Sequence, residues 1–548
     1  KRRREIHRLV AHAYEAQYGD RCLDDYAGIL AQHYAEAGDD ARVLVYSTRA
    51  GDLAARVYAN AEALEHYSRA LDAARRTGAT TAQLIHLYTR RGRVLEVIGQ
   101  YDKALSSYEE MASLAQTRNN RELELASLLP RATLRSAPMV TFNAELGQEH
   151  LDQALVLARE LGDRAAEAKI LWNSLLLSLH ASQPKQAIEY GERALAIARE
   201  LNSSGRDMRD QLAYILHDLS TPYLFGADPA RGVALSAEAR ELWRALDNKP
   251  MLADSLGMVA QLSVFQGNFV SALEYGSEGA AIAQSSGNGF GVIFNKSFIA
   301  VSHLELGEFD AVWRLGNELL QHAETIGAMN VAIPASIFAW FLAMLGVFEP
   351  AREMDRRARL TLTGPMPSHF RVRSYATLAR ANILRGELAA AAGDIAACRL
   401  ETLPDMQFYA VAQMGLAEGE LALAQNDPAR ACGVVDPYIS TGQQSGFRWM
   451  LPDLLLVRGI SLRQEGEMDA ALESLDQART LATEMNARRM LWQILALLSQ
   501  VEKERGNGTE AVKLKTQARE IVEYIVAHTP QQFRESILNL PDVRAVST

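Results

Sequence analysis

Small residues recur through this chain at intervals of about 40 positions, and this period constrains the fold more than any other feature. The positions that mark it are Ala63, Ala104, Gly147, Ala187, Gly232, Ala272, Val312, Ala351, Ala391, Ala431, Ala471 and Ala511. A second small residue often follows seven positions later, which places both on one face of a helix. A fixed period of this length indicates a solenoid, in which each unit packs mainly against its neighbours.

A second set of positions divides each unit into two helices. Seven of the marked residues have a glycine five positions before them, namely Gly99, Gly267, Gly307, Gly346, Gly386, Gly466 and Gly506. Another small residue stands seven positions before the glycine, as at Gly92, Ala260 and Ala339. Glycine adopts the left-handed backbone conformation that ends a helix, and small residues let two helices approach closely. Each unit is therefore predicted to contain a helix A, a tight turn and a helix B.

This unit resembles the tetratricopeptide repeat. The pattern of small residue, glycine, aromatic residue and small residue is carried by Gly92, Gly99, Tyr101 and Ala104, and again by Ala339, Gly346, Phe348 and Ala351. The resemblance covers about residues 23 to 526 and implies an all-α, right-handed superhelical solenoid. Because the ordinary unit has 34 residues, a period of about 40 predicts longer helices. We expect N-terminal helices in 1–57, about twelve units in 58–526 and a tail in 527–548, with the least regular units between 120 and 250.

The two ends of the chain resemble the helical-repeat region of large bacterial signal-transduction ATPases, transcriptional regulators and ATPase-linked nucleotide cyclases. Three segments carry this resemblance: AEAGDDA at 35–41, ANAEALEHY at 59–67 and FRESILNLPDVR at 533–544. In that family an ATPase domain precedes the repeats, so the resemblance implies that residues 1–57 continue from such a domain. It implies a sensor or scaffold region that biases the ATPase between two states. The alternative is a free-standing adaptor that binds peptide segments of partner proteins.

Composition and motifs disfavour several other functions. The net charge of −10 disfavours nonspecific nucleic-acid binding, and no apolar stretch is long enough to span a membrane. The cysteines Cys22, Cys398 and Cys432 are too far apart for a zinc motif and fit a reducing cytoplasmic compartment, with Cys398 buried. No phosphate-binding loop, nucleophile elbow or metalloprotease motif occurs, and the glycines at 287–291 are interpreted as a turn. We therefore predict no catalytic residue, metal or cofactor.

The concave face of the solenoid is the predicted binding surface. Counting from the turn glycines along helix A places these side chains on it: Gln261, Trp340, Arg373, Arg380, Gln413, Glu420, Asp453, Arg463, Gln493 and Gln500. Such side chains suit a protein segment, a peptide or a small polar ligand, and an ordinary solvated face is the alternative. Arg373 and Arg380 are expected to be exposed and to bind carboxylate or phosphate groups, which favours an anionic or mixed-charge ligand. Trp172, Trp449 and Trp492 are interpreted as helix-packing residues.

Overall fold

The computed structural model describes residues 1–22, 24–137, 141–224, 226, 228–326, 329–364 and 366–547, and all regular elements in this part of the chain are helices. They are α1 (Arg2–Cys22), α2 (Ala27–Ala37), α3 (Asp40–Arg56), α4 (Asn60–Thr77), α5 (Thr81–Val97), α6 (Tyr101–Arg118), α7 (Arg121–Ser136), α8 (Ala144–Leu161), α9 (Arg164–His180), α10 (Pro184–Ser203), α11 (Arg209–Leu224), α12 (Pro229–Ala245), α13 (Lys249–Phe265), α14 (Phe269–Ser286), α15 (Gly289–Leu306), α16 (Phe309–Ile326), α17 (Met329–Met344), α18 (Phe348–Leu362), α19 (Ser368–Leu384), α20 (Leu388–Glu401), α21 (Phe408–Ala424), α22 (Pro428–Ser445), α23 (Leu451–Gln464), α24 (Met468–Glu484), α25 (Arg488–Glu504), α26 (Gly508–Ala527), the 3-10 helix η1 (Gln531–Phe533), α27 (Arg534–Leu538) and α28 (Pro541–Ser547).

Helices α3 to α26 form twelve hairpins, in which an odd-numbered helix A packs against the even-numbered helix B that follows it. Each small residue that marks the sequence period is the fourth residue of a helix B, from Ala63 in α4 to Ala511 in α26, and each is buried. This confirms the predicted all-α solenoid of helix-turn-helix units. Its handedness and the predicted domain limits stay predictions, although the first hairpin includes α3 and so begins before residue 58.

The turns between helix A and helix B follow the predicted chemistry. All seven predicted turn glycines have φ between +73° and +85°. Three hairpins use the same turn without glycine, since Tyr58, Ser182 and Asn426 occupy the equivalent position with φ near +60°. Small residues also permit close helix packing, because a Cβ on Gly92 would lie 2.2 Å from the Tyr108 ring.

Two further predictions about single residues are confirmed, the first of them in part. The predicted turn at 287–291 is confined to Gly287, which ends α14 in the left-handed conformation, and Asn288, whose side chain caps α15; Gly289 and Gly291 already belong to α15. Cys398 is fully buried in the core. None of the described helices combines the length and the apolar character needed to cross a bilayer.

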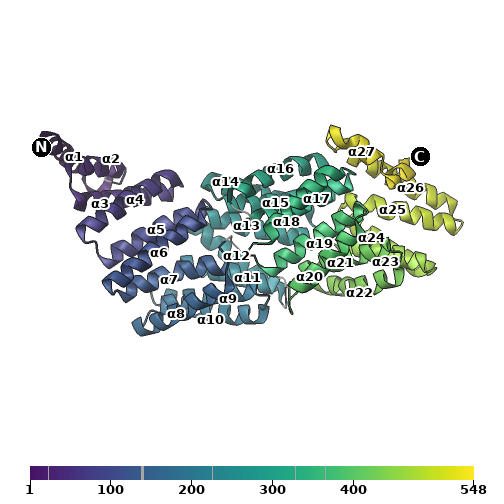
Figure 1. Ribbon diagram of the computed structural model, residues 1–548, viewed down its shortest axis with the longest axis horizontal. Coiled ribbons are helices and arrows are strands. Elements are labelled where there is room, and N and C mark those ends of the chain that lie inside the picture. The colour runs from purple at the N-terminus through teal and green to yellow at the C-terminus, as the bar shows by residue number, and fades with distance from the viewer. Residues whose placement is uncertain are drawn as a thin grey trace.

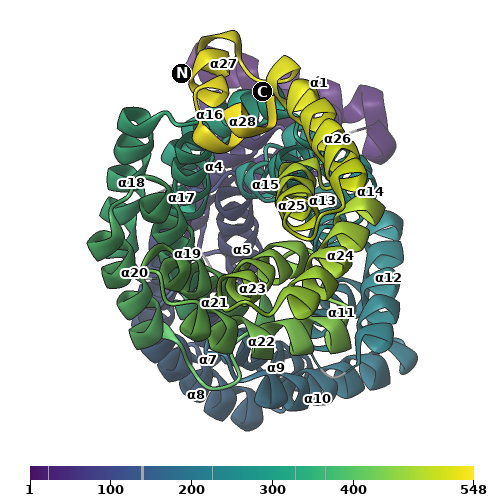
Figure 2. The same cartoon turned by 90° about the vertical axis from the view of Figure 1, so that its right-hand side faces the viewer.

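The hairpins wind into a superhelix whose successive turns touch. The helices A lie around the inside and the helices B, such as α8, α10, α18 and α20, lie on the outside, while the termini lie at opposite ends of the long axis (Figures 1 and 2). Hydrogen bonds join residues about 180–230 positions apart, so one turn takes about five hairpins. We call these contacts the seam: Tyr58 with Asp247 and Lys249, Leu179 with Gln407, Phe265 with Arg448 and Trp449, Leu306 with Arg488, and Asp310 with His528.

Candidate functional site

The inside of the superhelix encloses a cavity of about 380 Å³, which we call the central cavity. Helices A from α5 to α21 line it, together with Tyr101 at the start of α6 and the residues that directly precede α15 and α21. Most of its lining is apolar or aromatic, including Met258, Phe290, Ile293, Phe294 and Phe370. A volume of this size and a mainly apolar lining with a few polar groups are typical of small-molecule sites.

Two carboxyl groups line the central cavity without an ion pair among the described residues. Asp218 accepts a hydrogen bond of 2.6 Å from the indole nitrogen of Trp172, and Asp254 accepts one of 3.3 Å from the Asn288 amide. Burial raises the pKa of each carboxyl to about 7. These acids are therefore partly protonated at neutral pH and can either donate or accept a hydrogen bond.

A second polar group on the cavity wall consists of His180, His369, Arg373 and Gln407. The two imidazole rings stack with their centroids 5.7 Å apart, and neither Nδ1 has a hydrogen-bond partner in the described part of the chain. Burial lowers the pKa of both imidazoles, so both are neutral at pH 7. The Gln407 amide nitrogen donates to the carbonyl of Leu179 across the seam, which leaves its buried Oε1 without a partner.

Arg373 differs from most arginines of the solenoid because it forms no ion pair with any described residue. Its guanidinium lies over the Tyr409 ring at 5.3 Å, and its buried Nε has no hydrogen-bond acceptor. Burial lowers the pKa of Arg373. The side chain lines the central cavity and also a smaller adjacent cavity, which lies between α15, α17, α19, α21, α23 and α25.

The smaller cavity, of about 40 Å³, collects several of the side chains that the sequence predicted for the concave face. Trp340, Arg373, Arg380, Gln413 and Asp453 all line it, and the Gln413 Oε1 is buried without a partner. Gln261, predicted with them, lines the central cavity instead. Counting positions from the turn glycines thus correctly predicted that these six side chains lie on the inside of the superhelix. Their role in binding stays a prediction.

Charged side chains beside the smaller cavity form a closed group, which we call the interior charge network. Arg380 binds Glu420 at 2.7 Å and Asp453 at 2.9 Å, and Arg489 binds Asp453 and Glu305 at 2.9 and 2.8 Å. Both guanidinium groups also lie over the Trp340 ring. Burial opposes ionisation of Asp453, but the two arginines outweigh it and hold its pKa below the usual range.

This network corrects the expectation that Arg380 is an exposed groove residue. Only 14% of its side-chain surface is accessible, and Asp453 is buried. The outer members of the predicted set are also engaged with their neighbours: Arg463 binds Glu504 and Gln500, and the Gln493 amide donates to the Arg489 carbonyl. These side chains satisfy one another because residues of adjacent and more distant hairpins meet inside the superhelix, which a count along one helix does not show.

Two tryptophans interpreted as packing residues have polar roles at the cavities. The indole of Trp172 donates to Asp218, and the indole of Trp449 donates to Glu305 at 2.8 Å. Both side chains line a cavity. The place of Trp172 on a helix A could have predicted from the sequence that it faces the inside of the superhelix. The contact of Trp449 could not be predicted in this way, because its partner Glu305 is 144 positions away in the sequence.

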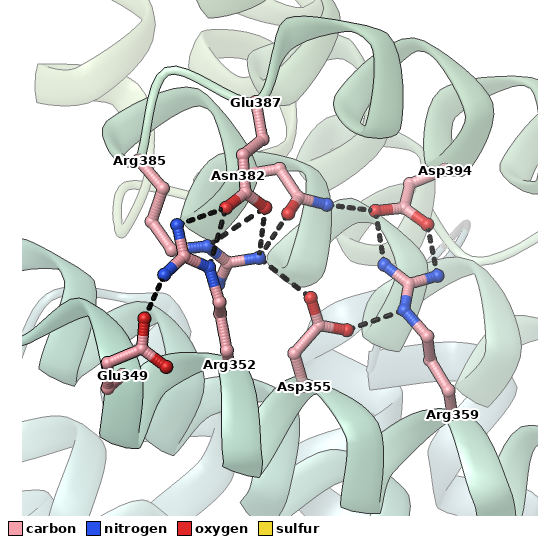
Figure 3. Close-up of polar contacts among 8 residues, drawn as sticks. All are labelled: Glu349, Arg352, Asp355, Arg359, Asn382, Arg385, Glu387 and Asp394. Atoms are coloured by element: carbon pink, nitrogen blue, oxygen red, sulfur yellow. Dashed lines mark hydrogen bonds and ion pairs between the residues drawn. The ribbon is translucent and has the colours of Figure 1, made fainter.

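A third polar cluster joins α18, α19 and α20 (Figure 3). Arg359 binds both Asp355 and Asp394, Arg385 binds Asp355 at 2.8 Å, and Asn382 donates to Asp394 at 2.7 Å. Burial raises the pKa of Asp394 despite the Arg359 contact. None of these residues lines either cavity, and the carboxylates already have arginine partners. The cluster therefore fastens two neighbouring hairpins together.

No protein-family model and no curated protein matches this chain. Among the described residues, no group of histidine, cysteine and acidic side chains is placed to hold a metal ion. Two solved structures of helical proteins align along nearly the whole length. Yeast Tom70 has 13% identity and a TM-score of 0.37 over 91% of this chain and 96% of its own. Cut9–Hcn1, a hetero-tetramer of the APC/C, has 12% identity and a TM-score of 0.43 over 98% of this chain and 97% of its own.

Proposed function

We propose that this chain is a non-catalytic binding region that holds a small molecule inside its superhelix. The observation that carries the proposal is the central cavity of about 380 Å³, whose mainly apolar wall contains Arg373, His369 and Gln407 with buried atoms that lack partners. A buried polar atom without a hydrogen bond costs about 1–3 kcal/mol, so a ligand that satisfies these atoms gains affinity. The scattered polar groups offer no nucleophile–base pair, which favours binding over catalysis.

Native mass spectrometry with a small-molecule library tests this proposal. We expect one or more compounds to bind and to quench the fluorescence of Trp172, which lines the central cavity. Replacing Ser297, a cavity-lining residue of α15, by tryptophan fills the space and abolishes binding. The matched control is Ser277→Trp on the exposed side of α14. If no compound binds, or if binding survives Ser297→Trp, the central cavity is not a ligand site.

The proposal extends to the protein context that the resemblance of the two ends implies. We infer that ligand binding in the superhelix regulates an ATPase domain in the same polypeptide, and that the region works in the cytoplasm. The upstream coding sequence tests this, because a phosphate-binding loop there supports it and a start codon just before Lys1 contradicts it. In the full-length protein, a ligand found by the screen is expected to change the rate of ATP hydrolysis.

A protein-binding adaptor is the second candidate function. Leu360 and Leu400 occupy equivalent positions of the neighbouring helices α18 and α20, and they are 78% and 88% exposed. Adjacent exposed leucines on helices B suit a contact with another protein. Changing both to serine would then abolish partner binding and leave small-molecule binding intact, which separates the two functions.

A further inference from the structure

We propose that the central cavity takes a molecule with one carboxylate and an apolar body, and that Arg373 binds the carboxylate. This inference rests on the proposed function and names the chemical class of its ligand. It follows from three observations: the missing counter-ion of Arg373, the neutral groups around it, and the apolar lining beyond them.

The first observation is that Arg373 has no counter-ion, although its neighbours on the inside of the superhelix do. Arg380, seven residues later on α19, binds Glu420 and Asp453, and Arg489 binds the same Asp453 and Glu305. A guanidinium enclosed by protein is costly unless it is paired. Arg373 faces both cavities with its Nε unsatisfied, so the missing anion is one that the described chain does not supply.

The second observation concerns charge around Arg373. The nearby imidazoles of His180 and His369 are buried and stacked, each with an unpartnered Nδ1, and no lysine lines the central cavity. A single guanidinium balances a single negative charge and presents two parallel N–H groups, which match a carboxylate. A phosphate dianion would bring a second charge, and the other guanidinium of this wall, that of Arg93, already pairs with Glu96 at 2.9 Å.

The third observation is the shape of the rest of the site. Met258, Phe294, Ile337 and Phe370 continue the lining as apolar surface. The carboxyl groups of Asp218 and Asp254 belong to α11 and α13 and accept hydrogen bonds from Trp172 and Asn288. In their ionised form they repel an anion, so the carboxylate is directed to Arg373 while the apolar body fills the space between the two polar regions.

The test uses three probes that share one apolar body: decanoate, decanol and decylamine. Isothermal titration calorimetry at pH 7.5 should show decanoate binding at least tenfold more tightly than either of the others. Arg373→Gln should lower the decanoate affinity about tenfold to a hundredfold, as expected for the loss of a charge-assisted hydrogen bond, and leave decanol unchanged. Arg463→Gln, whose side chain pairs with Glu504 and lines neither cavity, is the matched control.

Each contrary outcome has a distinct meaning. Equal affinity for decanoate and decanol would overturn the role of Arg373 but keep the cavity as a binding site. Tighter binding of decylamine than of decanoate would show that the site prefers a cationic head group beside Asp218 and Asp254, and would overturn the inference. Unchanged decanoate affinity in Arg373→Gln and in Arg373→Met, both with wild-type helicity by circular dichroism, would also overturn it. If no probe binds, this ligand class is wrong, and the library screen decides the proposed function separately.

Discussion

Arg373 and Arg380 lie two helical turns apart on α19, and both line the smaller cavity, yet their surroundings are opposite. Arg380 binds Glu420 and Asp453, which belong to α21 and α23. Arg373 binds no carboxylate of the described chain and lies against an aromatic ring. The same residue type, on the same face of the same helix, therefore belongs to the framework in one case and faces an open site in the other.

This comparison gives a physical way to separate structural charges from binding charges inside a solenoid. A buried charge that is paired within the chain contributes to holding helices in place, and its loss leaves the partner buried and alone. A buried charge without a partner destabilises the fold and gains a favourable interaction only when a ligand arrives. Removing the charge should therefore lower the free energy of unfolding for a paired charge and raise it for an unpaired one.

The largest expected effect is at Arg489, in the interior charge network. Arg489→Met leaves Glu305 and Asp453 buried with one fewer cation, and we expect the free energy of unfolding to fall by about 3–5 kcal/mol. The measurement is the midpoint of urea unfolding, followed by circular dichroism. A fall in the free energy of unfolding of less than about 1 kcal/mol would show that the network does not stabilise the fold.

The next effect concerns pH and the acids of the central cavity. A carboxyl with a pKa of about 7 in the folded chain and about 4 in the unfolded chain stabilises the fold below pH 4, and this contribution is lost as the pH rises through 7. Asp218→Asn keeps an acceptor for Trp172 and removes the titration. We expect it to raise stability by about 1–2 kcal/mol at pH 8, with the gain shrinking towards pH 5.

Thermal melts of Asp218→Asn and wild type between pH 5 and 8 measure this gain. An increase that is independent of pH would mean that the carboxyl is ionised throughout that range. A loss of stability at pH 8 would contradict the assignment of a buried, unpaired acid.

A smaller effect of opposite sign to that of Arg489 is expected at Arg373. Arg373→Met removes a buried cation that has no carboxylate partner among the described residues, and we expect this gain to exceed the loss of the ring contact and the side-chain hydrogen bond with Tyr409. We expect the free energy of unfolding to rise by about 1 kcal/mol in the absence of ligand. Urea unfolding measures it, and a loss comparable to that of Arg489→Met would show that Arg373 has a partner within the chain.

The smallest effect is expected at Arg463, whose pair with Glu504 is partly exposed to solvent. Arg463→Gln should change stability by less than about 0.5 kcal/mol, because solvent screens such a pair. Raising the salt concentration should leave this difference small. A loss above about 1 kcal/mol would mean that burial is not what distinguishes the interior charge network.

The sequence predicted the repeat but none of these ion pairs, although one pair follows the same spacing of about 40. Arg380 and Glu420 are 40 positions apart and so occupy equivalent places on neighbouring helices A. Asp453 is 73 positions from Arg380, and Glu305 is 184 positions from Arg489. Those distances depend on how tightly the superhelix winds, which the spacing within one unit does not determine. For this reason the sequence identified Arg373 as an inward-facing side chain but could not show that it lacks a counter-ion.

The turns between helix A and helix B were also only partly predictable from the sequence. Seven were predicted from glycine, but Tyr58, Ser182 and Asn426 adopt the same left-handed conformation in three other hairpins. Tyr58, for example, is held by hydrogen bonds to Asp247 and Lys249 across the seam. At Tyr58, contacts with a distant hairpin thus accompany a left-handed turn that the sequence could not predict, because no glycine marks it.

The seam also sets the mechanical character of the molecule. An open solenoid stretches like a spring, because small rotations between neighbouring repeats add up along its axis. Here one coil is fastened to the next, and the turn at Gly267 is so close to Met485 that an added Cβ would lie 2.1 Å from the Met485 sulfur. A pulling force must therefore separate coils before any repeat can yield. We therefore expect the superhelix to resist stretching more than an open solenoid of the same length.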